Sequence, residues 1–324
     1  MSASVRWGIL GCGSIATSAI VPAIRWAGGC ELLAIASRSI ERAKQKCSEV
    51  GAPRAYGSYA DLLADREIDA VYIGLPNGEH TRWAISAAEA GKHVLCDKSL
   101  ALDPRAALTT RKAFADHRVR LVEGFMYRHH PQWTLVRNLI DTDAIGRVRH
   151  VRAVLRATLD DPKDHRWSKT LGGGALFDVT CYAINAARLV TREEPTRARA
   201  FAAFTSTGVD ESTDALLQFP SGATASVHGS LRAPFEQSVV ISGEHGRIVI
   251  ERPFVPHWDP VEVVVERNGH ARRAHAVGGA NHFLHMIEHA TRCFRDADFL
   301  LFPAEDGTAN VAACAMVLDA ARAV

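Results

Sequence analysis

Short apolar runs alternate with amphipathic stretches along the first 123 residues. The apolar runs predict strands at residues 5–10, 32–36, 70–74, 93–96 and 120–123, and helical periodicity predicts helices near 14–27, 39–50, 59–65, 78–90 and 104–117. Asp103 followed by Pro104 is typical of a helix start, and Gly91 is typical of a helix end. Strands and helices that alternate with short connections predict a parallel sheet.

Near residue 146 the pattern changes to long runs rich in Val, Ala, Thr and Phe. They predict strands at 148–158, 197–205, 212–219, 224–231, 238–242, 247–251 and 261–266, with hairpin turns at 220–222 and 243–246. Helices are predicted near 176–189, 281–296 and 304–322. The predicted fold class is α/β. A doubly wound parallel sheet occupies residues 1–124, and an α+β domain with an open, mainly antiparallel sheet occupies residues 125–324.

The second domain is expected to form the subunit contact. Helices that cover one face of an extended sheet leave the other face to be buried, so we expect a homodimer or homotetramer through this sheet. The C-terminal helix at 304–322 is a candidate to pack back on the N-terminal domain.

Composition narrows the function classes. A chain of 324 residues with 47% hydrophobic and 23% charged residues is long enough for two cores. Its 38 basic and 36 acidic side chains are spread along the sequence, so we expect no nucleic-acid partner. No window approaches eighteen consecutive apolar residues, and Met1 to Ser4 lead directly into the first predicted strand. We therefore expect a cytoplasmic protein without a membrane partner.

Cysteine and histidine patterns give little indication of a metal. The seven cysteines are scattered and never form a C-x-x-C pair, which argues against disulfides and zinc. His282, His285 and His289 lie at helical spacing, but no cysteine or carboxylate pattern completes a ligand set. We expect no metal site.

A glycine turn follows the first predicted strand, with Gly11 and Gly13 ahead of Ser14, Ile15 and Ala16. Two such glycines permit a tight turn and let the backbone approach a pyrophosphate, whose charge then faces the unpaired N–H groups of a helix start. Ala16 is small enough for close helix–strand packing. An ordinary strand–helix turn is the alternative, but this position and flanking pattern favour a dinucleotide site of the Rossmann type.

The end of the second predicted strand indicates which dinucleotide is bound. An NAD-preferring site usually has a carboxylate here, whereas this chain has Ser37, Arg38 and Ser39. A guanidinium and hydroxyl groups suit a ribose with a 2′-phosphate, so we predict NADP, with NAD possible. The alternative is that Arg38 is a solvated residue that pairs with Glu41.

Two further segments follow predicted strands and face the expected cofactor. The first segment contains Leu75, Pro76, Asn77 and His80. Asn77 is a candidate helix cap, and Asn77 and His80 are candidates to border the cofactor. A lone histidine at a helix start also has a structural interpretation. In the second segment, Lys98 can bind a substrate oxygen and stabilise an alkoxide, or it is a solvated surface lysine.

A third segment combines glycines with two polar side chains. Residues 172–174 are all glycine, which allows a close backbone approach to a ligand, and Asp178 and Tyr182 then fall four apart on one helical face. A tyrosine needs a nearby cation to ionise usefully, and Lys98 is a candidate for that cation. Alternatively, Asp178 pairs locally and Tyr182 packs in the core.

Together these motifs resemble the Gfo/Idh/MocA family of sugar oxidoreductases over essentially the whole chain. The resemblance is greatest to the branch with glucose-fructose oxidoreductase, NADP-dependent xylose dehydrogenases, trans-dihydrodiol dehydrogenase and sugar ketoreductases, because of residues 123–128 (EGFMYR) and the tyrosine at 182.

The resemblance implies a second domain that binds substrate, and hydride exchange between nicotinamide and a sugar carbon. It makes Lys98, Asp178 and Tyr182 the catalytic residues. Cofactor contacts are implied at the positions Gly11, Gly13, Ser14, Ile15, Ser37, Arg38, Leu75, Pro76, Asn77, His80, Asp97, Lys98 and Arg166.

The chain departs from the family at one motif. The family has Glu-Lys-Pro where this chain has Asp97, Lys98 and Ser99. A cis bond before Ser99 costs about 3 kcal/mol, against less than about 1 kcal/mol before proline, so the bond is either trans or strained. We interpret the chain as an NADP-dependent sugar or polyol oxidoreductase. An NAD-assisted glycosidase and a catalytically silent NADP(H)-binding regulator are the alternatives.

Overall fold

The computed structural model describes residues 4–296 and 300–323, so Met1 to Ala3 of the leading segment lie outside it. It divides the chain into two compact units. The first unit contains Met1–Phe125 and Phe283–Thr308, and the second contains Met126–His282 and Ala309–Val324. The chain thus returns to the first unit after residue 282. A single boundary near residue 124 therefore does not separate the two units.

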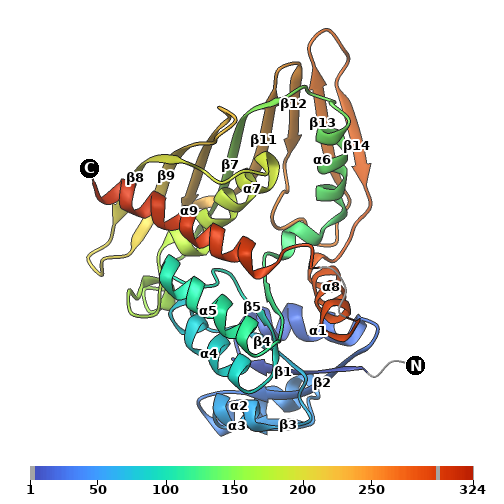
Figure 1. Ribbon diagram of the computed structural model, residues 1–324, viewed down its shortest axis with the longest axis vertical. Helices are drawn as coiled ribbons and strands as arrows, with labels where there is room; N and C mark the ends of the chain where they lie inside the picture. Colours follow the sequence, from blue (N-terminus) through green and yellow to red (C-terminus); the bar gives the residue numbers. More distant parts are fainter. Residues whose placement is uncertain (1–3, 297–299, 324) are drawn as a thin grey trace. The chain divides into compact units, whose positions relative to one another are not determined.

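The first unit is built on a parallel sheet. In the described part of the chain this sheet has six strands in the order β3-β2-β1-β4-β5-β6 (Figure 1). The strands are β1 (Val5–Leu10), β2 (Cys30–Ala36), β3 (Arg54–Tyr56), β4 (Ala70–Ile73), β5 (His93–Cys96) and β6 (Leu121–Glu123). The strand order reverses between β1 and β4. Ligands of doubly wound sheets bind at such a switch point, beyond the carboxyl ends of the strands.

Helices connect these strands. They are a π-helical turn η1 (Ala16–Ile20) that continues into α1 (Val21–Trp26), then α2 (Ile40–Val50), α3 (Tyr59–Ala64), α4 (Asn77–Glu89) and α5 (Pro104–Asp116). The side chains of Ser39, Ser58 and Asp103 each accept a backbone N–H bond in the first turn of the helix that follows, as N-caps do. The sequence pattern predicted these helices but missed β3, because three half-buried residues carry no periodic signal.

The second unit contains a large, mainly antiparallel sheet. Its order, among the described residues, is β14-β13-β12-β11-β7-β10-β9-β8, and β7 and β10 are its parallel pair. The strands are β7 (Val148–Thr158), β8 (Arg197–Phe204), β9 (Asp210–Gln218), β10 (Thr224–Ser230), β11 (Arg232–Gly243), β12 (Gly246–Ile250), β13 (Val261–Arg267) and β14 (Arg273–Val277). The two predicted hairpin turns join β9 to β10 and β11 to β12, as expected.

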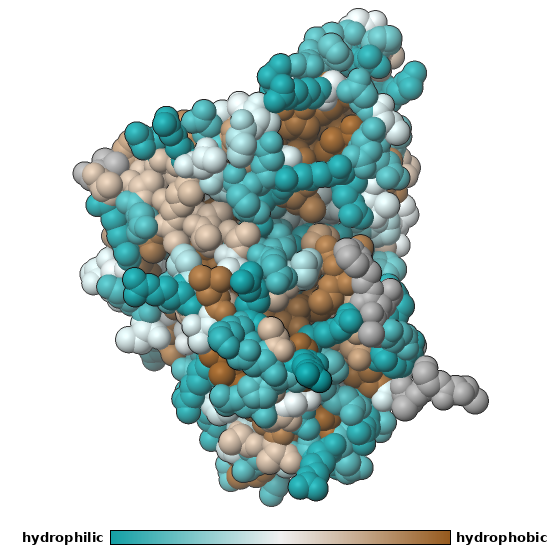
Figure 2. Space-filling view, in the orientation of Figure 1, coloured by the Kyte–Doolittle hydropathy of each residue, from teal (hydrophilic) through white to brown (hydrophobic). Residues whose placement is uncertain are grey.

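Helices cover one face of this sheet. A π-helical turn η4 (Leu176–Thr180) runs into α7 (Cys181–Thr191), which packs on β7 and β10, and α6 (Pro131–Asp141) packs on β13 (Figure 1). The short 3-10 helices η2 (Met126–His129) and η3 (His165–Trp167) precede these elements. The sequence pattern missed α6 and β14. In Figure 2, hydrophilic side chains cover the tip of the hairpin between β13 and β14.

The remaining helices are α8 (His282–Asp296) and α9 (Ala304–Arg322). All but the first residue of α8, together with the first turn of α9, group with the first unit, and the rest of α9 groups with the second. None of the helices within residues 4–296 and 300–323 combines the length and apolar character that a membrane span requires.

Candidate active site

The glycine turn follows β1 and lies between the carboxyl ends of β2 and β4. Gly11 donates its N–H to the Ala36 carbonyl at 3.0 Å and has a φ of +108°. A Cβ at this position would lie 2.5 Å from the Gly74 carbonyl oxygen, so the fold itself requires glycine here. At Gly13 the nearest atom to such a Cβ is 3.9 Å away. Gly13 therefore leaves open space beside the turn, which a bound pyrophosphate requires.

The helix start behind this turn is exposed. Gly13, Ser14 and Ile15 are exposed, with Ile15 at 43%, whereas Ala16 is buried against the sheet. The small side chain of Ala16 thus suits a closely packed position, as predicted. The exposed turn has the form that binds phosphate groups through backbone N–H groups. The residues present fit a dinucleotide.

Past β2, the structure pairs Glu41 with Ser39 rather than with Arg38. Ser39 accepts the Arg42 N–H at 3.2 Å and donates its hydroxyl to Glu41 at 2.7 Å. This hydroxyl holds the pKa of Glu41 below its usual range. Ser37 is buried and Arg38 is exposed, so the guanidinium of Arg38 stays accessible to a ligand.

Arg42 is a further cation that the sequence reasoning missed. Its guanidinium reaches the carbonyl oxygen of Cys12, in the glycine turn, at 3.5 Å. Burial raises the pKa of Tyr59, and the charges of Arg38 and Arg42 act on it in the opposite direction, so both guanidinium groups lie near this phenol. The cap at Ser39 was the available signal, because it places Arg42 in the first helical turn.

The helix after β4 begins one residue earlier than expected. Pro76 occupies the N-cap position and its carbonyl accepts the Glu79 N–H at 2.8 Å. The prediction that Asn77 caps this helix is wrong, because Asn77 is already its first residue.

His80 is fully buried between two backbone carbonyls. Its Nδ1 lies 2.8 Å from the Ser99 oxygen and its Nε2 lies 2.8 Å from the Leu75 oxygen. Burial lowers the pKa of His80, although the two carbonyls and Asp97 act to raise it. This geometry favours the structural interpretation: His80 joins the segment after β4 to the segment after β5.

The segment after β5 contains the lysine. The Lys98–Ser99 peptide bond is cis rather than trans. Asp97 accepts the Lys98 N–H at 2.8 Å through one carboxylate oxygen and the Tyr72 hydroxyl at 3.3 Å through the other. Ser99 is buried and Lys98 is half-buried. The Asp97 carboxylate therefore holds the backbone that carries Lys98.

In the second unit, Arg166 and Asp178 form an ion pair. The Arg166 Nε donates to Asp178 at 2.8 Å, and Nη1 lies 3.2 Å from both carboxylate oxygens of Asp164. The two carboxylates raise the pKa of Arg166 against the effect of burial. Asp178, whose side chain is 18% exposed, is thus held in one orientation.

The glycine run packs against this arginine. Gly174 donates its N–H to the Arg166 carbonyl at 2.9 Å, and a Cβ at Gly173 would lie 2.1 Å from the same oxygen. Gly174 has a φ of +111° and lies against Asp210. The close approach that these glycines allow is therefore to the chain itself rather than to a ligand.

Asp210 is a second residue that the sequence reasoning missed. Its carboxylate accepts the Leu176 N–H and the Thr213 hydroxyl, both at 2.7 Å. Burial raises the pKa of Asp210. This carboxylate supplies the helix start at Leu176 with an acceptor from a distant strand, and no local sequence pattern signals such a contact.

Tyr182 lies one turn beyond Asp178 and is 7% exposed. Its hydroxyl donates to the Met126 sulfur at 3.4 Å, and its ring packs at 5.9 Å from the Tyr127 ring and 5.6 Å from the Phe254 ring. Tyr127 in turn donates to Asn185 at 2.6 Å. A thioether is a weak hydrogen-bond acceptor.

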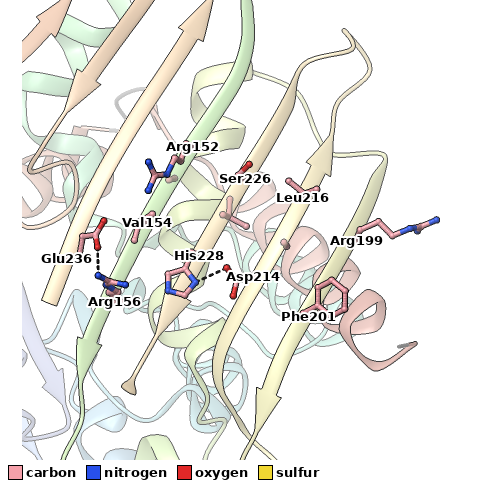
Figure 3. A pocket seen from close by; sticks show the side chains of 13 residues that line it. Arg152, Val154, Arg156, Arg199, Phe201, Asp214, Leu216, Ser226, His228 and Glu236 are labelled. Carbon is pink, nitrogen blue, oxygen red and sulfur yellow. Dashed lines mark hydrogen bonds and ion pairs between the residues drawn. The ribbon is translucent and has the colours of Figure 1, made fainter. Parts of the chain in front are cut away.

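A cavity of about 400 Å³ lies on the open face of the second sheet, which is the face that the helices leave uncovered (Figure 3). Arg152, Arg156, His228 and Leu216 contribute to its lining, and His228 lies 2.9 Å from Asp214. The backbone of Gly229 lies against Thr180 on the helix-covered face. Because side chains alternate along a strand, His228 points to the opposite face. This cavity is therefore separate from Asp178 and Tyr182.

Two of the three histidines in α8 have partners within the helix. His285 lies 3.2 Å from Glu288, and His289 lies 3.3 Å from the Cys293 sulfur. Across residues 4–296 and 300–323, no group of three His, Cys, Asp or Glu side chains is placed to hold a metal ion.

Comparisons with known proteins match both units. A family model described as "Oxidoreductase family, NAD-binding Rossmann fold" matches residues 5–125, and a model of the GFO/IDH/MocA C-terminal domain matches residues 133–249. An oxidoreductase of Rhizobium meliloti is 41% identical over 266 residues, which are 82% of this chain and 80% of that protein.

A D-xylose 1-dehydrogenase (NADP(+)) of Haloferax volcanii is 40% identical over 254 residues, 77% of each protein. Among solved structures, a 3-ketoreductase from Actinomadura kijaniata in complex with NADP and TDP-benzene has a TM-score of 0.92 at 28% identity and covers 98% of both chains.

Proposed function

This chain belongs to the GFO/IDH/MocA family of oxidoreductases, and from that premise we propose that it transfers a hydride between NADP and a ring carbon of a sugar or polyol. The observation that carries the proposal is the placement of Asp178 and Tyr182 one helical turn apart, with Asp178 fixed by Arg166. The named relatives support it, since they include a sugar dehydrogenase and a ketoreductase.

The choice of NADP rests on two guanidinium groups that follow β2 in the chain. Arg38 is exposed and Arg42 reaches the Cys12 carbonyl, so both are placed to bind a 2′-phosphate, with Ser37 beside them. Among the relatives, the xylose dehydrogenase is named for NADP(+) and the ketoreductase structure contains NADP. When bound, this cofactor supplies the nicotinamide carbon that accepts or gives the hydride.

Each catalytic residue then has a defined task. Lys98 donates a hydrogen bond to the reacting oxygen and stabilises negative charge on it. Tyr182 gives or takes the proton at that oxygen. Asp178 accepts hydrogen bonds from neighbouring hydroxyl groups and so orients the ring, while Asp97 and His80 hold the backbone on either side of Lys98.

A substrate screen tests the function. The purified protein is mixed with NADP or NADPH and with aldoses, inositols, keto-sugars and dihydrodiols, and the nicotinamide absorbance is followed. We expect stoichiometric formation or loss of NADPH with at least one class. Product release without net nicotinamide consumption would indicate the glycosidase alternative. Tight NADPH binding without turnover of any compound would indicate the regulator.

We also propose a homodimer or homotetramer through the open face of the second sheet. Phe201 and Leu216 are 68% and 58% exposed on this face (Figure 3). Large apolar side chains gathered on one face are typical of a subunit contact. A cytoplasmic location stays a prediction.

A further inference from the structure

Glu123 is a buried carboxylate to which the proposed mechanism gives no task. It is the last residue of β6 and the first residue of the motif at 123–128, and it is 4% exposed. Its register partner on β5 is Cys96, and the Gly124 N–H binds the Cys96 carbonyl at 2.7 Å. The pairing of these strands therefore places Glu123 beside the segment that follows β5 and contains Lys98.

One oxygen of this carboxylate holds the backbone two residues after the lysine. Oε1 of Glu123 accepts the Leu100 N–H at 2.8 Å, and both Ser99 and Leu100 are buried. A hydrogen bond from a backbone N–H to a carboxylate is stronger than one between neutral groups. Solvent does not readily replace an acceptor that is lost from a buried N–H, so the position of Leu100 depends on Glu123.

The first turn of α9 lies behind the carboxylate, within the same unit. A Cβ at Gly307 would lie 3.0 Å from Oε2 of Glu123 and 3.2 Å from Cδ2 of Leu100, which is closer than ordinary van der Waals contact. The absence of a side chain at Gly307 thus leaves room for the carboxylate. The helix and the end of the sheet together limit the rotamers that Glu123 can adopt.

Glu123 and His80 hold opposite sides of one peptide group. His80 lies 2.8 Å from the carbonyl oxygen of Ser99, and Glu123 accepts the N–H of Leu100, which belongs to the same planar group. A peptide group that is held at its carbonyl and at its N–H cannot turn about its own axis. The backbone that follows Lys98 is therefore fixed in orientation.

We propose that Glu123 is a positioning residue for Lys98. By holding the N–H side of the Ser99–Leu100 peptide, it keeps the lysine backbone where the ammonium group reaches the reacting oxygen. The inference rests on the proposed function, because it concerns the lysine that stabilises charge on that oxygen. The role requires no contact between Glu123 and substrate or cofactor. A displacement of about 1 Å is enough to lower a rate by about 100-fold.

A double-mutant cycle tests this route of action. With NADP or NADPH and the sugar or polyol that the wild type turns over fastest, kcat and KM are measured for Glu123→Ala, Lys98→Met and the double variant. Glu123→Ala should lower kcat at least about 10-fold. In the Lys98→Met background, the same substitution should change kcat by less than about 2-fold, because the group that Glu123 positions is gone.

Two variants separate positioning from a loss of stability. Glu123→Gln keeps an oxygen that can accept the Leu100 N–H, so its kcat should stay within about 3-fold of the wild type. Lys92→Met removes a different buried group of the first unit, whose Nζ donates to the carbonyl oxygens of Asp65 and Ile68 at 2.7 Å. This control should unfold at a lower urea concentration and should keep kcat within about 2-fold.

Hydrogen exchange tests the contact independently of the reaction. Mass spectrometry follows exchange in the peptide that contains Leu100, in the protein without added substrate. Glu123→Ala should speed this exchange at least about 10-fold, whereas Glu123→Gln and Lys92→Met should leave it unchanged. Should Glu123→Ala not fold, Glu123→Asp replaces it in both measurements, because its carboxylate is one methylene too short to reach the same N–H.

Three outcomes would overturn the inference: additive effects in the cycle, an equal loss of kcat in Glu123→Gln and Glu123→Ala, or wild-type exchange in Glu123→Ala. Faster exchange in Glu123→Ala, together with a wild type that turns over no sugar or polyol, would refute the proposed function alone.

Discussion

The imidazole Nδ1 of His80 lies 2.8 Å from the carbonyl oxygen of Ser99, a residue 19 positions further along the chain. The other ring nitrogen lies equally close to the Leu75 oxygen. One buried side chain therefore joins the segments that follow β4 and β5. Because Ser99 shares its peptide bond with Lys98, the position of the lysine backbone depends on His80.

Removing this imidazole should damage both stability and turnover. In His80→Ala the carbonyl oxygens of Ser99 and Leu75 lose the ring that lies against them. A neutral imidazole donates to one of these oxygens, and loss of that buried hydrogen bond should cost about 1–3 kcal/mol in the free energy of unfolding. Turnover should fall because Lys98 is no longer held in place. Urea unfolding and steady-state kinetics measure the two effects. The control is His117→Ala at an exposed position of the first unit. Equal behaviour of the two variants would contradict the role of His80.

Loss of Tyr182 or Lys98 should abolish most of the chemistry. Tyr182→Phe and Lys98→Met should each lower kcat by at least about two orders of magnitude, because an acid–base or oxyanion-binding group is lost. NADPH affinity, measured by fluorescence titration, should stay within a few-fold in Tyr182→Phe. Lys112→Met is the matched control, since Lys112 is an exposed lysine that pairs with Asp116. Near-normal rates in both site variants would refute the assignment.

Arg38 and Arg42 should discriminate between the two nicotinamide cofactors. Each alanine variant should weaken NADPH binding by roughly 10- to 100-fold, the effect of a lost charge-assisted hydrogen bond to phosphate, and should barely change NADH binding. Calorimetric titration with both cofactors gives the ratio. Lys44→Ala, another exposed cation on α2, should leave the ratio unchanged. Equal effects on both cofactors would mean that the 2′-phosphate is held elsewhere.

Asp210 should make stability depend on pH. Burial raises its pKa in the folded protein, so the folded state holds the proton more tightly than the unfolded chain does. The stability that this tighter proton binding contributes is complete below the pKa of Asp210 in the unfolded chain. It is lost as the pH rises through the pKa of Asp210 in the folded protein. Relative to the wild type, Asp210→Asn should therefore become more stable as the pH increases.

Urea unfolding of the wild type and of Asp210→Asn between pH 4.5 and 8 tests whether the variant gains stability relative to the wild type as the pH rises. Asp210→Ala should lose about 1–3 kcal/mol at all pH values, because the N–H of Leu176 and the hydroxyl of Thr213 lose their acceptor. A difference between wild type and Asp210→Asn that does not change with pH would contradict the interpretation.

A charge on the open face of the second sheet should dissociate the oligomer. Leu216→Asp places a carboxylate where the proposed contact needs an apolar side chain, so light scattering at micromolar concentration should show a monomer mass. Leu108→Asp, at an exposed position of the first unit, should leave the mass unchanged. A monomeric wild type would remove the proposal.

Much of the fold could be predicted from local patterns. The strand at Val5–Leu10 and the one at Val148–Thr158 have the bounds that the apolar runs predict, and Asp103 caps the helix that it was expected to begin. β3 and β14 were missed, since short, half-buried or exposed strands lack a periodic signal.

The candidate site was predictable as a set of residue types but not as a set of contacts. Lys98, Asp178 and Tyr182 follow from motif and spacing. The start of α4 at Asn77 and the contact of Arg42 with the glycine turn depend on where the backbone begins each helix. Such shifts of one residue change which side chain faces a ligand.

Residues close together in the chain are enough to establish the alternation of elements, the glycine turn and the types of side chain at the strand ends. That His80 contacts Ser99, that Asp210 caps Leu176 and that Asp164 and Asp178 share Arg166 became visible in the folded chain alone. Apart from the local pair of Asp164 and Arg166, these contacts join different loops and strands, or residues on either side of the glycine run at 172–174. Their distances are set by the packing of buried surfaces, which no local pattern encodes.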